Sequence, residues 1–181
     1  IADNNNSILN LTINNTIISN NTGGTSIIDL TNGTLNLNNV QIINNNIGNY
    51  CIRTGNNTSE KVLDNVVIDN NTGVGIYSIQ NATITNCTIS NNIGGGIQGL
   101  YNSVIENTTI SGNKIVNGSS NGAGISFGNI GDENNNTLTN VIIRDNQTIN
   151  GMGGGIKLEN NSGNVVFENV TITKNYAPKG G

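Results

Sequence analysis

The stretch "ATITNCTISNNIGGGI", residues 82–97, alternates apolar and polar side chains and then runs through three glycines to an isoleucine. At its centre Cys87 and Ile89 alternate with hydroxylated residues, and β-branched side chains dominate. A period of two is typical of a β-strand with one buried face. Asn, Thr and Gly at this density are poor helix formers. The stretch therefore predicts short strands separated by tight turns.

The same phrase recurs along the whole chain. Written as apolar–x–Asn–x–x–apolar–x–x–Asn, it occurs seven times, at 13–21, 37–45, 63–71, 84–92, 105–113, 138–146 and 167–175. After each copy but the last, a turn containing glycine leads to another apolar residue. One such unit cannot bury its apolar side alone, whereas stacked units share a continuous core. The repeat predicts an all-β, parallel β-helix solenoid of about seven coils, forming a single domain over residues 1–181.

Residues at equal phase in successive coils should stack on one another. The predicted inward columns are Ile13, Leu37, Leu63, Ile84, Ile105, Leu138 and Phe167; Ile18, Ile42, Ile68, Ile89, Ile110, Ile143 and Ile172; and Ile52, Ile76, Ile97, Ile125 and Ile156. We expect the first Asn of each copy to form a structural Asn ladder in a sharp turn: Asn15, Asn39, Asn65, Asn86, Asn107, Asn140 and Asn169. Asn tolerates the left-handed backbone conformation, and its amide can both donate and accept between coils. We expect the glycines to meet the same backbone demand at the other corner.

The phrase "NCTISNNIGGGI" (86–97) resembles the repeat of right-handed parallel β-helix proteins, the pectin-lyase-like superfamily, whose coils carry an Asn ladder in one tight turn. The spellings "GGGI" and "FENV" are also similar to repeats of polymorphic outer-membrane proteins and archaeal adhesin-like proteins. Gly here replaces an Ala of those repeats, and only Phe167 supplies a Phe in that register. The resemblance implies a right-handed β-helix over nearly the whole chain. It leaves function open, because enzymes, tailspikes and adhesins share the scaffold.

Enzymes of this fold that cleave carbohydrates resemble one another in placing acids on an outward strand face. The outward row after the glycine corner is predicted to hold no carboxylate: Arg53, Tyr77, Gln98, Ser126 and Lys157. Asp64 and Glu106 share a phase but lie two coils apart, about 9.6 Å, and a glycosidase needs two carboxylates at a common bond. The chain has no His, the commonest acid–base catalyst near neutral pH. We predict a protein that is not an enzyme, with no catalytic residues.

Metal and cofactor sites are likewise not predicted. The closest acid cluster, Asp132–Glu133, is interpreted as a solvated loop, and "GMGGGIKLE" (151–159) lacks the Asp of the calcium-binding glycine-rich repeat. The two cysteines are interpreted as buried free thiols. A net charge of −4 disfavours a nucleic-acid partner, and no apolar run reaches the roughly 18 residues of a membrane span. An ice-binding face would need regular Thr ranks, and the outward row from Ile17 to Thr171 is irregular.

Sixteen asparagines lie in Asn-x-Ser/Thr sequons. Those predicted to lie in loops are candidate N-glycosylation sites: Asn32, Asn56, Asn117, Asn135 and Asn160. Sequons at the ladder positions Asn86, Asn107 and Asn169 are expected to stay bare, because a glycan would not fit in a stacked turn. Used sequons would place the chain outside the cell, so we expect an extracellular or cell-surface location.

These observations predict a non-catalytic structural or adhesive element of a cell-surface protein or filament. The alternative is a β-helix that binds or cleaves carbohydrate, which a convergence of acids in one groove would favour. Segments 114–121 and 128–136 are expected to leave the rod as loops. Ile1 falls at the phase of Ile156, so the chain is predicted to be a segment of a longer array or a filament subunit that associates end to end, with surface glycans as a further class of partner.

Overall fold

The computed structural model describes residues 1, 8–55, 58–116, 122–128, 134–159 and 163–181. None of the described residues form a helix with the length and hydropathy to span a membrane. The described strands are β1 (Leu11–Ser19), β2 (Ser26–Asp29), β3 (Leu35–Ile43), β4 (Tyr50–Arg53), β5 (Lys61–Asp69), β6 (Val74–Gln80), β7 (Ala82–Thr85), β8 (Thr88–Ser90), β9 (Ile97–Tyr101), β10 (Val104–Glu106), β11 (Thr109–Ser111), β12 (Lys114–Ile115), β13 (Ile125–Phe127), β14 (Asn135–Thr139), β15 (Ile142–Arg144), β16 (Gln147–Thr148), β17 (Ile156–Leu158), β18 (Asn164–Glu168) and β19 (Thr171–Thr173).

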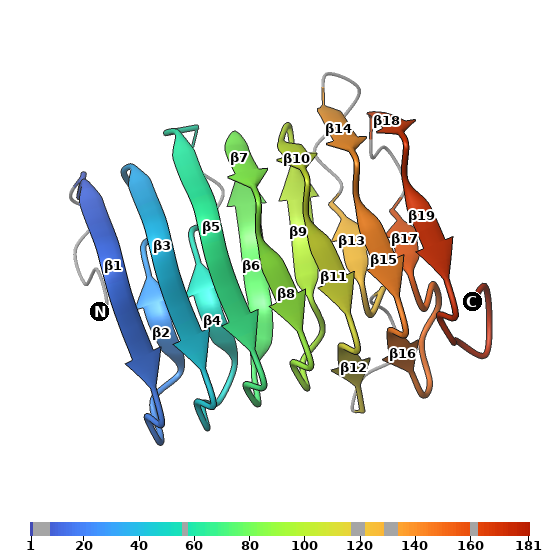
Figure 1. Cartoon of the computed structure of the whole chain (residues 1–181), viewed down its shortest axis with the longest axis horizontal. Coiled ribbons are helices and arrows are strands. Elements are labelled where there is room, and N and C mark those ends of the chain that lie inside the picture. Colours follow the sequence, from blue (N-terminus) through green and yellow to red (C-terminus); the bar gives the residue numbers. More distant parts are fainter. Residues whose placement is uncertain (2–7, 56–57, 117–121, 129–133, 160–162) are drawn as a thin grey trace.

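Two large parallel sheets face each other along the rod (Figure 1), and β12 and β16 form a further two-stranded parallel sheet. The larger sheet has 11 strands and the smaller has six, in the order β2-β4-β6-β9-β13-β17. In the larger sheet β1, β3 and β5 are continuous, whereas each later coil contributes a pair of shorter strands, such as β7 with β8. Every coil pairs in parallel with the coils before and after it. The chain is therefore an all-β parallel β-helix, as its repeat predicts.

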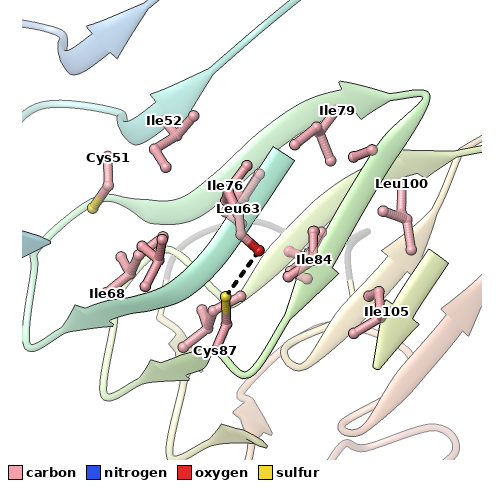
Figure 2. Close-up of a cluster of buried hydrophobic side chains, with 14 of the residues drawn as sticks. Cys51, Ile52, Leu63, Ile68, Ile76, Ile79, Ile84, Cys87, Leu100 and Ile105 are labelled. Atoms are coloured by element: carbon pink, nitrogen blue, oxygen red, sulfur yellow. Dashed lines mark hydrogen bonds between the residues drawn. The ribbon is translucent and has the colours of Figure 1, made fainter. Parts of the chain in front are cut away.

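The strand register confirms all three predicted inward columns. In the middle of the rod Leu63, Ile68 and Ile76 have no exposed surface, and Figure 2 shows these side chains packed together between the sheets. Ile28 pairs with Ile52 and extends the third column by one coil. Burial of these columns supplies the main stabilisation, because apolar area removed from water contributes about 25 cal/mol per Å².

Both cysteines are buried free thiols, as the sequence predicts. Cys87 lies in a further inward column that includes Val40 and Val66 and points into the core, where its Sγ lies 3.5 Å from the carbonyl oxygen of Leu63 (Figure 2). Burial raises the pKa of Cys51 to about 12 and that of Cys87 to about 11. A thiol that holds its proton so firmly is a poor nucleophile and metal ligand.

The bends in the larger sheet are made by residues with positive φ. The rank from Asn15 to Asn169 has φ between 50° and 56°, and a second such rank follows five residues later, with Asn20, Asn44, Asn70 and Asn91 at 53° to 58°. Non-glycine residues seldom adopt this conformation, and Asn does so at the lowest cost. The first rank is Asn in every coil, whereas the second also accepts Gly112, Asp145 and Lys174, so the backbone favours Asn at both ranks without requiring it at the second.

The glycines that precede the third column have a different role from the one expected. A Cβ at Gly75, Gly96 or Gly124 would lie 2.9 Å from the Cγ2 atom of the isoleucine that faces it across the core. None of these three glycines has a positive φ. The same Cβ would lie still closer, at 2.3 to 2.7 Å, to the carbonyl oxygen of the corresponding glycine in the following coil. These positions are glycines because a neighbouring coil and the facing sheet both approach closely, so the expectation of a shared backbone demand is wrong here. That demand does apply to the adjacent Gly95, whose φ is 109°.

The two segments expected to leave the rod contribute in part to its walls. In the first, Ile115 is buried in β12, which pairs with β16. In the second, Asn136 is fully buried in β14, and its Oδ1 accepts the backbone N–H of Ser103 at 3.1 Å. The expectation of a loop is therefore wrong at these positions, and residues 117–121 and 129–133 lie outside the described residues.

Lys61 is among the largest fully buried side chains of the described core. It stands in an inward column between Leu35 and Ala82, and the small Ala82 leaves room for it. Its Nζ donates to the carbonyl oxygen of Ser59 at 2.6 Å. Burial lowers the pKa of Lys61 to about 8, because the core disfavours the charged ammonium.

Lys61 should make stability depend on pH. Between pH 8 and its ordinary value of 10.5 the unfolded chain binds the proton more tightly than the folded chain, so the free energy of unfolding should rise with pH across this window. Lys61→Met should remove this rise. The measurement is urea unfolding of both chains across the window. The difference between their free energies of unfolding at each pH removes the contribution of the two thiols, which both chains share. Lys114→Met, at an exposed lysine, is the matched control and should unfold with the pH dependence of the unmodified chain. Equal pH profiles for Lys61→Met and the unmodified chain would contradict the prediction.

Candidate functional site

The most regular polar feature of the described chain is a rank of asparagines inside the core, the inner ladder. Its members end each copy of the repeat phrase: Asn21, Asn45, Asn71, Asn92, Asn113, Asn146 and Asn175. The backbone N–H and Nδ2 of each donate to Oδ1 of the next, at 2.8 to 3.2 Å. From the second member onward, Nδ2 also donates to an isoleucine carbonyl of the preceding coil, at 2.9 to 3.0 Å. The amides bind each coil to both of its neighbours.

The rank expected to form the ladder, Asn15 to Asn169, lies on the surface at the bends. Amide hydrogen bonds join Asn39 to Asn15, Asn65 to Asn39, Asn140 to Asn107 and Asn169 to Asn140, at 2.7 to 3.2 Å. Asn86 donates instead to Asp64, at 2.8 Å. Every copy of the phrase contains both the surface Asn of this rank and the Asn of the inner ladder. The structure places the continuous ladder at the inner one.

Two aspartates of β5 accept hydrogen bonds from surface asparagines of the following coil. Asp64 accepts from Thr85 Oγ1 at 2.9 Å and from Asn86 Nδ2 at 2.8 Å. Asp69 accepts from Ser90 Oγ at 2.6 Å and from a neighbouring amide at 2.8 Å. The bonds from Asn86 and Thr85 hold the pKa of Asp64 below its usual value, because they stabilise the charged carboxylate. These two acids bind coils together.

The smaller sheet carries charged pairs on its outward face. The sequence predicts a row without carboxylates, and this is wrong by one coil, because Asp29 pairs in register with Arg53. Its Oδ2 lies 3.2 Å from Arg53 Nη1. At the other end of the row Lys157 forms an ion pair with Glu159. The part of the chain that the structure describes holds no cluster of three residues able to ligate a metal, and Asp132 and Glu133 lie outside it.

Three tyrosines lie in or near this row, and Tyr77 is one of its members. We call Tyr50, Tyr77 and Tyr101, with Asp29 and Arg53, the tyrosine surface. The rings of Tyr50 and Tyr77 stack with their centroids 4.2 Å apart and an interplanar angle of 18°. Partial burial raises the pKa of Tyr50 and of Tyr101, and the proximity of Tyr77 adds to both shifts. The structure thus joins three aromatic side chains from β4, β6 and β9 into one surface.

The candidate glycosylation sites have different settings. Asn32 lies half-buried in the turn between β2 and β3, and its carbonyl accepts the N–H of Leu9 at 3.2 Å. Asn135 is the exposed first residue of β14 rather than a loop residue, and its Oδ1 accepts from Asn164 Nδ2 at 3.0 Å. The remaining candidates, Asn56, Asn117 and Asn160, lie outside the described residues.

Comparison with known proteins gives one family. The protein family described as right handed beta helix region matches residues 27–181. No curated protein and no solved structure matches the chain. The matched span includes every inner-ladder residue from Asn45 onward.

The two Asn ranks should differ in their contribution to stability. Asn92→Ala removes the acceptor of the Asn71 backbone N–H and Nδ2 in a fully buried position. At about 1–3 kcal/mol for each buried group left unpaired, the loss should reach about 3 kcal/mol or more. Asn65→Gly keeps the positive φ and loses one exposed bond of 3.1 Å, so it should cost about 1 kcal/mol or less. Urea unfolding of the two variants measures this, and equal losses would show that the inner ladder has no special role.

Proposed function

Because the chain belongs to the right-handed β-helix family, we propose that it is a non-catalytic structural or adhesive element of an extracellular, cell-surface protein or filament. The observation that carries this proposal is where the recurring polar residues lie. They hold one coil to the next, both in the inner ladder and at the surface bends. A chain that uses its most regular polar groups in this way is built for a stiff, extended rod.

The arrangement of the acids also supports a structural role. Asp64 and Asp69 accept bonds from the following coil, and Asp29, Asp145 and Glu159 each form an ion pair with a basic residue. Among these acids, the pKa of Asp64 is held below its usual value by the bonds from Asn86 and Thr85, which makes its carboxyl a weak general acid. These contacts favour a scaffold over a hydrolase or a lyase.

The extracellular location rests on the sequons and on the resemblance to adhesin-like repeats. The exposed Asn135 and the half-buried Asn32 are the described candidates for a glycan. A polar surface with few charges suits a rod that meets other surface molecules. End-to-end association with a further β-helix segment and contact with surface glycans are its proposed interactions.

Surface labelling tests this function. Antibodies raised against residues 1–181 should label intact cells of the source organism, and external protease should remove the label while a cytoplasmic marker survives. Glycosidase treatment of the released material should lower its mass if the sequons are used. Labelling that requires permeabilised cells would overturn the proposal.

The tyrosine surface favours a second candidate function, the binding of a carbohydrate chain. Stacked aromatic rings offer flat apolar faces that suit the C–H face of a sugar ring, and the adjacent Asp29 and Arg53 can exchange hydrogen bonds with hydroxyl groups. The rings of Tyr50 and Tyr77 are held by their mutual stacking, which reduces the ordering cost of binding. This arrangement favours binding rather than cleavage.

A glycan array tests this second function. The unmodified chain should bind a subset of glycans, and Tyr77→Ala should weaken that binding roughly two- to tenfold, as expected for about 0.5–1.5 kcal/mol per aromatic contact. Tyr176→Ala is the matched control, because Tyr176 is exposed and lies at the end of the rod, away from the tyrosine surface. No bound glycan, or equal weakening by both variants, would reject the second function.

A further inference from the structure

A contact between two aromatic rings joins successive coils in the middle of the rod. Tyr50 lies in β4 and Tyr77 in β6, and their rings stack with the centroids 4.2 Å apart and an angle of 18° between the planes. The contact does not follow from the repeat, because Tyr50 pairs in register with Val74, whereas Tyr77 pairs with Arg53. The two side chains therefore converge from different positions of their strands, and their phenol rings meet across the boundary between two coils.

The backbone holds both rings in place. The N–H of Tyr50 donates to the carbonyl oxygen of Thr25 at 3.1 Å, and the carbonyl oxygen of Tyr77 accepts from the N–H of Thr54 at 3.4 Å. Both tyrosine side chains are only partly buried, so a reagent in solution can reach their phenols. Two reacting groups that are held in contact react in an effectively unimolecular step, without the cost of an encounter.

Two phenol rings in contact are the reactants of a covalent modification, the oxidative coupling of tyrosines. We propose that Tyr50 and Tyr77 form a dityrosine cross-link when an oxidant of the peroxidase class acts on the chain with hydrogen peroxide. The bond would join two coils covalently and close a loop of about one coil, which reduces the conformational freedom of the unfolded chain. This modification site goes beyond the proposed structural function, which names no covalent bond between coils.

The reaction is a pair of one-electron oxidations followed by the formation of one carbon–carbon bond. Each phenol gives up one electron and the proton of its hydroxyl group and becomes a phenoxyl radical. One molecule of hydrogen peroxide takes up the two electrons and the two protons and becomes two molecules of water. The radicals then join through ring carbons next to the hydroxyl groups, and solvent carries the hydrogen of each joined carbon to the oxygen beside it. Stacking suits this step, because a carbon that becomes tetrahedral is approached through the face of its ring.

The other two tyrosines have different surroundings. A Cβ at Gly128 would overlap the Tyr101 ring, so this ring packs against the backbone of Gly128. Tyr176 is 57% exposed and follows β19 in the last described coil. Neither ring stacks on another among the described residues. Tyr50 and Tyr77 are therefore the pair that should couple within one chain.

Treatment of the dilute, purified 181-residue chain with a haem peroxidase and hydrogen peroxide provides the test. Monomer isolated afterwards should show dityrosine fluorescence, and mass spectrometry of its peptides should find a linked pair that contains Tyr50 and Tyr77 and has lost two hydrogen atoms. Tyr50→Phe and Tyr77→Phe should each lose this linked pair, because Phe keeps the ring but has no phenol to oxidise. Tyr101→Phe and Tyr176→Phe are the matched controls and should retain it.

Several outcomes would overturn the inference. These are a treated monomer without dityrosine, a linked pair within the monomer that joins other tyrosines, and dityrosine that occurs only between chains. Peptide mapping uses the unmodified chain, so the test does not depend on the folding of any variant. Surface labelling of cells measures location and is independent of this reaction. A failure of the proposed extracellular role is therefore distinguishable from a failure of the cross-link.

Discussion

The buried amide ladder is the interaction on which the rest of the structure depends. A chain that turns inward once in every coil must bring backbone N–H groups into the core, where an unpaired donor costs about 1–3 kcal/mol. Asn71 shows how this is solved, since its backbone N–H and Nδ2 both reach the Oδ1 of Asn92 while a second Nδ2 hydrogen reaches Ile42 O. A Ser or Asp at this position could not supply the two amide hydrogens. Because each amide is both donor and acceptor, the ladder continues through the described coils without an unpaired group between its ends.

The ladder also constrains the residues around it. The residue before each ladder Asn must have a positive φ to turn the amide inward, as Asn70 and Asn91 do. Across the core, Gly96 lies so close that a Cβ there would approach Asn113 Nδ2 to 3.1 Å and Ile110 Cγ2 to 2.9 Å. The same Cβ would lie 2.6 Å from the Gly124 carbonyl oxygen of the next coil, so a larger residue at this glycine would disturb both the stacking of coils and the ladder. The isoleucine, the paired asparagines and the glycine of each copy are therefore one packing unit.

This regularity bears on both proposed roles. The ladder gives the described rod a polarity, because each amide donates to the Oδ1 of the following coil. The tyrosine surface departs from the repeat, because its residues differ from coil to coil while the core behind them does not. Because the core is constant and the outer face varies, the sides of the rod can acquire a binding function without disturbing the fold. Lys61 is a departure of the opposite kind, a charge-bearing residue in the core that the small Ala82 accommodates.

The alternation of apolar residues and the spacing of the repeat are enough to predict the parallel β-helix, its three inward columns and its buried thiols, because stacking in register follows from periodicity alone. The choice between the two Asn ranks needed the folded chain. A residue with positive φ shifts the in-and-out alternation by one, so Asn21 turns inward where strict alternation from Ile18 would point it outward. Asp29 and the three tyrosines lie far apart in sequence, and only the stacking of coils of unequal length brings them to one face. The recurrence of the glycine at position 96 is visible in the repeat, but only the packed structure shows that a close contact with the next coil and the facing sheet, rather than a positive φ, requires it.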